Sequence, residues 1–132
     1  MKPRPLSIAL VVLLGVINVG RGAIHMFASD GGLIRIADLD ISQATPLVLS
    51  FIAAVGAGQL TFAMVDFAAA IRFREFVRPL VLIHLAQAAL TVFLLFVWRP
   101  LPHDVPGQWG ALAAMIVIGF CAAMEYGRNK DA

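Results

Sequence analysis

The sequence has little cysteine and little charge. Cys121 is the single cysteine, so the chain cannot form an internal disulfide. It also lacks the C-x-x-C or equivalent dithiol that membrane thiol oxidoreductases need. Charged residues make up 14% of the chain, against about 25% in soluble proteins. The basic residues form no stripe with interleaved aromatic residues, which excludes a recognisable nucleic-acid-binding pattern. Phosphate loops, nucleophile elbows and catalytic triads are absent too, which favours a non-enzymatic protein.

Apolar residues, in contrast, make up 61% of the chain. A soluble core of this size cannot hide so much apolar surface. The apolar residues form four runs, each close to the roughly 20 residues that a helix needs to cross a bilayer. The runs are continuous rather than alternating, which argues against a β-barrel. The sequence therefore predicts one all-α membrane domain over 1–132, a bundle of four transmembrane helices at about 6–28, 46–71, 79–98 and 109–127.

The basic residues at the ends of these runs predict the orientation in the membrane. Seven lie on one side and two, Arg35 and Arg99, on the other. By the positive-inside rule, the N-terminus, the 72–78 turn and the C-terminus are cytoplasmic. Aromatic residues at helix ends agree, because they are typical of the membrane interface: Trp98, Trp109 and Tyr126. The seven basic residues on the predicted cytoplasmic side are Lys2, Arg4, Arg72, Arg74, Arg78, Arg128 and Lys130.

The outer loop, 29–45, mixes apolar residues with acids. Its composition predicts a segment that lies on the membrane surface or caps the bundle. Asp30-Gly31-Gly32 is typical of a turn after the first helix. The spacing of the other residues fits neither a helix nor a strand, so the loop's conformation stays open.

Small residues recur on the helix faces at spacings that let helices approach closely in lipid. They predict packing within the bundle or, alternatively, a homodimer face. Cys121 fits the same role as a small packing residue. The small residues are Gly15, Gly20, Gly22, Ala54, Gly58, Gly119 and Ala123.

A first polar cluster lies in the first helix. Asn18, Arg21 and His25 are spaced i, i+3, i+7 and share one face. Arg21 falls in the outer third of the membrane, where an unpaired arginine is costly. One hypothesis is an outward-facing site for an anion or polar headgroup, closed by Asp30, Asp38 or Asp40. The alternative is that Arg21 only pins the outer loop through a charge-assisted pair.

A second cluster lies in the next two helices. Gln59 and Asp66 share a face of one helix, and His84, Gln87 and Thr91 share a face of the next. Asp66 and His84 are expected at nearly the same depth, so we predict that they touch. The pair is either a minimal proton relay or a buried charge neutralised by its neighbour.

The remaining acidic residues and histidines have simpler interpretations. Glu125 can pair with Arg128 at i, i+3. His25 and His84 are expected roughly 20 Å apart along the membrane normal, too far to share one iron. His25 and His103 could meet near Asp104, but no metal-ligand spacing supports a site there. We therefore expect no metal and no cofactor.

The four-helix plan, with Gly15, Arg21, Gly22 and His25 in the first helix, resembles the small bacterial membrane proteins of the DoxX-like and related uncharacterised groups. The likeness covers the topology of the whole chain. It implies a bacterial inner-membrane location and an accessory role beside redox or envelope enzymes, and it transfers no catalytic residue. The small multidrug transporters have the same size, but their functional carboxylate lies in the first helix, where this chain has Asn18 and Arg21.

Three functions remain open at this stage. The leading one is a non-enzymatic accessory or scaffold subunit, with a membrane-protein partner or a second copy of the chain. The second is a small proton-coupled transporter that uses Asp66 and His84. The third is a quinone- or haem-associated redox component that uses His25, Arg21 or His84.

Overall fold

The computed structural model describes residues 2–42, 45–101 and 104–127. Within these ranges the chain is helical and contains no strand, so the predicted four-helix class is confirmed. A 3-10 turn, η1, precedes α3, and a π-helical turn, η2, follows it. The elements are α1 (Pro5–Phe27), α2 (Thr45–Ile71), η1 (Arg74–Phe76), α3 (Val77–Phe93), η2 (Leu94–Trp98) and α4 (Pro106–Tyr126).

Prolines begin the first and last helices. Pro5 and Pro106 occupy the first helical turn, where the missing N–H has no partner to lose and the fixed φ suits a helix. Val105 before α4 is extended, as a residue preceding proline prefers. Helix α4 therefore begins three residues before the expected Trp109, because the sequence-based limit followed the apolar run and missed the Pro-Gly-Gln turn in front of it.

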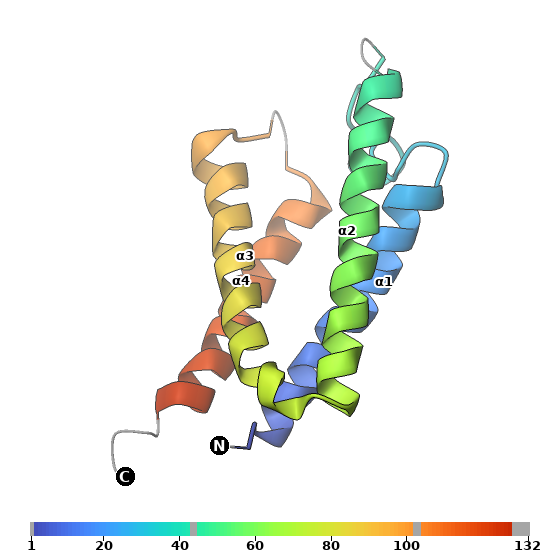
Figure 1. Cartoon of the computed structure of the whole chain (residues 1–132). Helices are drawn as coiled ribbons and strands as arrows, with labels where there is room; N and C mark the ends of the chain where they lie inside the picture. Colours follow the sequence, from blue (N-terminus) through green and yellow to red (C-terminus); the bar gives the residue numbers. More distant parts are fainter. Residues whose placement is uncertain (1, 43–44, 102–103, 128–132) are drawn as a thin grey trace.

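The helices form two hairpins, α1 with α2 and α3 with α4 (Figure 1). The hairpins meet near the end where α1 begins and α4 ends, and they diverge toward the opposite end (Figure 1). The buried core lies at the joined end and draws on all four helices, with Val11, Ala69, Val81 and Cys121 among its members. Cys121 is thus a packing residue, as predicted. The opposite halves of the two hairpins are left without a shared core.

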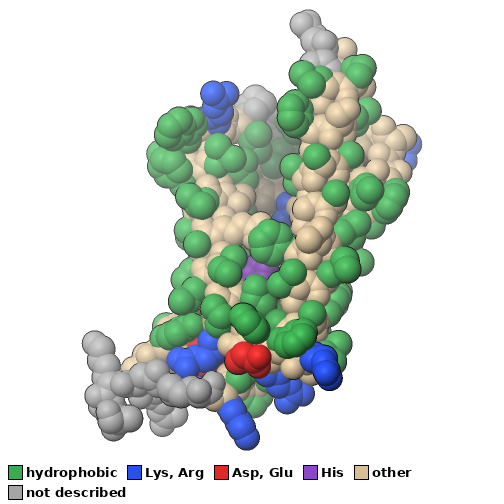
Figure 2. Space-filling model, in the orientation of Figure 1, with side chains coloured by type: hydrophobic (Ala, Val, Ile, Leu, Met, Phe, Trp, Pro, Cys, Tyr) green, Lys and Arg blue, Asp and Glu red, His purple; other side chains and the backbone are tan. Residues whose placement is uncertain are grey.

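Each hairpin presents a largely apolar surface (Figure 2). All four helical segments are long and apolar enough to cross a membrane. Basic and acidic side chains gather at the joined end, while the sides of the helices are mostly apolar (Figure 2). The fold is therefore compatible with a multi-pass integral membrane protein, and we call the joined end the inner end and the divergent end the outer end.

The outer loop folds into successive turns after α1. Gly31 and Gly32 have φ of 59° and 77°, a region that glycine enters without strain. A side chain at Gly31 would also collide with Ile52 of α2. The predicted turn at Asp30-Gly31-Gly32 is confirmed, and it directs the described part of the loop, up to Ser42, back toward α2.

Candidate functional site

Asp66 and His84 form a buried pair between the two hairpins. Asp66 comes from α2 and His84 from α3, and Nε2 of His84 lies 2.8 Å from Oδ1 of Asp66. The two residues are 0% and 4% exposed, respectively. The predicted contact is confirmed, because the two residues lie about one and a half to two turns from the short connection between α2 and α3. The second carboxylate oxygen, Oδ2 of Asp66, is buried without a hydrogen-bond partner among the described residues.

A cleft of about 330 Å³ lies directly beside this pair, between α1, α3 and α4. A histidine side chain is visible in the hollow between the hairpins (Figure 2). We call this space the interhairpin cleft. Its lining is formed by Leu14, Ile17, Asn18, Arg21, His84, Gln87, Ala88, Thr91, Gly107, Gly110, Ala111, Ala114 and Ile118.

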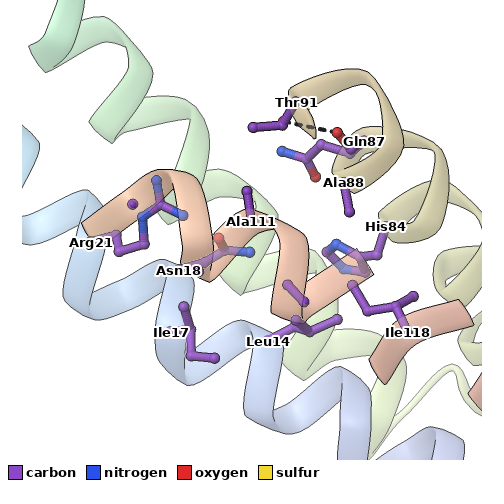
Figure 3. A pocket seen from close by; sticks show the side chains of 13 residues that line it. Leu14, Ile17, Asn18, Arg21, His84, Gln87, Ala88, Thr91, Ala111 and Ile118 are labelled. Carbon is purple, nitrogen blue, oxygen red and sulfur yellow. Dashed lines mark hydrogen bonds between the residues drawn. The ribbon is translucent and has the colours of Figure 1, made fainter. Parts of the chain in front are cut away.

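The polar residues of the cleft are spread along its length. Asn18 and Arg21 reach in from α1, and His84 and Gln87 reach in from α3 (Figure 3). Arg21 lies about one turn nearer the outer end than Asn18, and Thr91 lies about two turns beyond His84 in the same direction. The sequence predicted two separate clusters. The structure brings members of both into one cleft, with the His84–Asp66 pair at its inner end.

Glycines and alanines of α4 give the cleft its width. Gly107, Gly110, Ala111 and Ala114 line it opposite the polar residues of α1 and α3. A Cβ atom added at Gly107 or Gly110 would meet no atom within 4 Å. The cleft therefore exists because α4 presents small residues where larger ones would fill the space between the hairpins.

Arg21 has no ion-pair partner among the described residues. The acids of the outer loop bond to their own segment instead. Asp30 accepts hydrogen bonds from the backbone N–H groups of Gly32 and Arg35, at 3.1 and 2.9 Å. The bond from Arg35, followed by that from Gly32, holds the pKa of Asp30 below its ordinary value. Neither closure of the site by the loop acids nor an Arg21 anchor for the loop appears in the structure.

Asp40 is engaged in a similar way. Its Oδ1 accepts a hydrogen bond from the backbone N–H of Ser42, at 2.9 Å. That bond lowers the pKa of Asp40. Asp38 adopts a positive φ of 52° and is exposed. Asp30 and Asp40 thus stabilise turns, a role that the nearby glycine and serine residues favour.

His25 does not join Asn18 and Arg21 in the cleft. Its Nδ1 lies 2.8 Å from the carbonyl oxygen of Gly31, and its Cβ is close to Gly56 of α2. The i, i+3, i+7 spacing grouped these three residues, but of them only Asn18 and Arg21 line the cleft. His25, however, is in the last turn of α1, where the chain folds back and supplies a backbone partner.

Glu125 is the residue whose role the sequence did not reveal. Glu125 lies in α4 and is 5% exposed. Its carboxylate accepts hydrogen bonds from the Ser7 hydroxyl and from the backbone N–H of Arg4, the latter at 3.1 Å. Nε of Arg78 lies 3.1 Å from Oε1, an ion pair without the alignment of a hydrogen bond. The Arg78 guanidinium also stacks over Tyr126 at 4.8 Å. The expected partner Arg128 lies outside the described residues.

The remaining candidate residues lie apart from the cleft. Gln59 of α2 does not line it, and its Oε1 is buried without a hydrogen-bond partner in the described ranges. No group of three or more His, Cys, Asp or Glu side chains in the described part of the chain is arranged to hold a metal ion. His103, a possible neighbour of His25, lies outside that part.

Comparisons of the chain with protein-family models, with curated proteins and with solved structures found no match. The interhairpin cleft and the charged side chains around it are therefore the features of this chain that bear on its function.

Proposed function

We propose that the protein is a small proton-coupled transporter that admits its solute into the interhairpin cleft. One observation carries this proposal: the buried His84–Asp66 pair, bonded at 2.8 Å, contributes its histidine to the lining of the cleft. Histidine is the side chain that changes charge near neutral pH. Ionisable residues inside a membrane typically mark proton or solute pathways.

The pair has a place for a mobile proton. Oδ1 of Asp66 is bonded to His84, while Oδ2 is buried and unpartnered within the described structure. A buried carboxylate oxygen without a partner is unfavourable, and Oδ2 is the atom of the pair at which a proton has no competing hydrogen bond among the described residues. The charged and titratable groups facing His84 are Asp66 from α2 and Arg21 from α1, because α4 contributes none to the lining of the cleft. Proton binding at the pair thus changes the charge that a solute in the cleft encounters.

We further propose a setting for this function. The positive-inside bias supports an orientation with both termini in the cytoplasm, and the resemblance to small bacterial membrane proteins is what supports a bacterial inner membrane. The outer end of the cleft then faces the periplasmic side, and the packed inner end, which contains the core and Glu125, separates it from the cytoplasm. We propose that the chain works without catalytic chemistry of its own.

Proteoliposomes that enclose a pH-sensitive dye test this function directly. The probes are benzenesulfonate, benzyl alcohol and benzyltrimethylammonium, which share a ring and differ in fixed charge. We expect a gradient of at least one probe to move protons through the wild-type protein. Asp66→Asn and His84→Gln should each reduce the rate at least about tenfold, as for loss of a positioned proton-transfer group. Asp104→Asn, at an exposed residue of the outer connection, is the matched control. If all three probes are silent, or if Asp104→Asn has the same effect, proton coupling is refuted.

The second candidate is the accessory or scaffold subunit with a membrane-protein partner. The observation that favours it is the low burial of the helices: only 11% of the apolar window of α2 is buried inside the chain. Such a surface is available to another helix as well as to lipid. The two candidates separate in the same vesicles, because a transporter works as the purified single protein, whereas an accessory subunit is inactive without its partner.

A further inference from the structure

The interhairpin cleft carries one unbalanced positive charge. Arg21 contributes a guanidinium to its lining, and none of the described residues that line it is acidic. Asp66 stands behind His84 and is already bonded to it. An arginine within a membrane-spanning helix needs a partner or water, and the described residues supply Arg21 with no carboxylate. The surroundings of Arg21 in the cleft therefore suit an anion.

Amide groups surround the same space. Asn18 lies on α1 one turn inward of Arg21, and Gln87 faces it from α3 (Figure 3). The hydroxyl of Thr91 donates to the backbone carbonyl of Gln87, at 2.8 Å. A guanidinium flanked by amide N–H donors suits a planar oxyanion, because arginine binds carboxylates through two parallel hydrogen bonds.

The size and the walls of the cleft restrict the rest of the ligand. Its volume of about 330 Å³ is at the lower end of the range of about 300–1,000 Å³ that is usual for small-molecule sites. Leu14, Ala114 and Ile118 give its inner part apolar walls. The space accepts a compact body such as one ring or a short branched chain.

We propose that the cleft binds a small organic anion, with its carboxylate or sulfonate on Arg21 and its apolar body against Leu14, Ala114 and Ile118. This inference rests on the proposed transport function and names its solute class. One proton held by the His84–Asp66 pair offsets the charge of the bound anion. The anion and the proton then cross the membrane together without net movement of charge.

Calorimetric titration of the protein in nanodiscs of zwitterionic lipid tests the inference. The probes are benzoate, benzyl alcohol and benzyltrimethylammonium. We expect benzoate to bind at least about tenfold more tightly than benzyl alcohol, the scale of a charge-assisted hydrogen bond. Arg21→Gln should remove this preference. Arg35→Gln, at an exposed arginine of the outer loop, should leave it unchanged. Equal binding of benzoate and benzyl alcohol, or a preference for the cation, overturns the inference.

A second variant guards against misfolding of Arg21→Gln. Gly110→Leu leaves every charge in place and fills the cleft from α4, where the glycine has open space. It should abolish benzoate binding, and unchanged binding would show that benzoate sits elsewhere. Competition with laurate distinguishes the source of the anion. If laurate displaces benzoate from the wild-type protein and binds more weakly to Arg21→Gln, the site is assigned to fatty acids of the membrane. Failure of laurate beside tight benzoate assigns it to a water-soluble anion.

Asp66→Asn separates this inference from the proposed function. If the anion site exists and proton coupling also operates, Asp66→Asn should retain benzoate binding at low pH and lose the release or uptake of protons that accompanies binding. A benzoate preference that depends on Arg21, in a protein that moves no protons in vesicles, would support the anion site and refute proton coupling. Proton movement that depends on Asp66, in a protein without any preference for the anion, would support proton coupling and refute the anion site.

Discussion

Gly22 and Gly56 are residues at which the backbones of α1 and α2 approach each other closely. A Cβ atom at Gly22 would lie 2.9 Å from the carbonyl oxygen of Gly56, and one at Gly56 would lie 2.8 Å from the carbonyl oxygen of Gly22. The obstacle on each side is backbone, which cannot rotate away as a long side chain can. Helices in lipid associate through such close packing, since apolar burial offers little advantage there.

Replacing Gly22 by alanine should therefore destabilise the first hairpin. The added methyl group forces the two backbones apart, at a cost of about 1–3 kcal/mol, typical of overpacking. Gly20→Ala is the matched control in the same helix, because a Cβ there meets nothing within 4 Å. Unfolding of both variants in mixed micelles by increasing fractions of a denaturing detergent measures the difference. Equal stability of the two variants would contradict the close contact.

Single residues also show how far sequence reasoning reaches at this scale. The Asp66–His84 contact could be predicted, because two residues equally far from a short helix connection must lie at the same depth. The sequence could not show which of Gly20 and Gly22 contacts α2, since the packed face depends on the rotation of α1 about its axis. Gly56 is in contact, whereas the expected Ala54 and Gly58 are exposed, for the same reason. His25 was grouped with Arg21 because helical spacing says nothing of the loop that folds back onto it.

Glu125 connects three helices at their inner ends. Its carboxylate, on α4, accepts hydrogen bonds from the Ser7 hydroxyl and the Arg4 backbone N–H at the start of α1. It also forms an ion pair with Arg78 at the start of α3. The first turn of a helix has N–H groups without internal partners, and the carboxylate satisfies one of them. This contact joins the α1–α2 hairpin to the α3–α4 hairpin beside the apolar core.

Loss of the Ser7 hydroxyl should loosen this connection. Ser7 is 1% exposed, and a hydrogen bond to a charged group contributes about 1.5–3 kcal/mol. Ser7→Ala should lower the free energy of unfolding by that amount. Ser50→Ala provides the control, since the exposed Ser50 hydroxyl bonds only to a carbonyl of its own helix. The same micelle titration compares them, and a Ser7→Ala protein as stable as Ser50→Ala would show that Glu125 does not join the hairpins.

The existence of each helix was predictable from apolar content, and the contacts at helix ends were not. Glu125 was assigned to its neighbour in sequence because pairs at i, i+3 are visible along one helix. A partner on another helix requires knowing which faces meet. Its signal was present in hindsight, since Arg4, Arg78 and Glu125 all fall at the inner membrane surface that the positive-inside rule defines.

At the scale of the whole molecule, the function proposed above depends on two hairpins that are joined at one end and apart at the other (Figure 1). Composition predicted four helices, and charge predicted that both termini lie on the cytoplasmic side. They could not predict the cleft, because its position depends on how the hairpins diverge. The small residues of α4 that line it are the same types that elsewhere close a helix contact.

From the interhairpin cleft we predict a specific pattern of chemical accessibility along α4. Ala111 lines the interhairpin cleft, while Ala113, two residues further along the same helix, is exposed on the opposite, lipid-facing side. Cys121 is buried and is the single cysteine, so a Cys121→Ala background allows a new cysteine to be introduced at either position. Thiol reagents react with the thiolate, which forms in water and is disfavoured in hydrocarbon.

A membrane-impermeant maleimide added from the outer side should therefore label Ala111→Cys at least about tenfold faster than Ala113→Cys, because both lie at nearly the same depth and only the first faces a hydrated cleft. Mass spectrometry of intact cells sampled over time measures the two rates. Faster labelling from the cytoplasmic side would reverse the orientation deduced from the basic residues. Equal, slow labelling of both positions would mean that lipid fills the space between the hairpins, and the outward-facing cleft would then have to be abandoned.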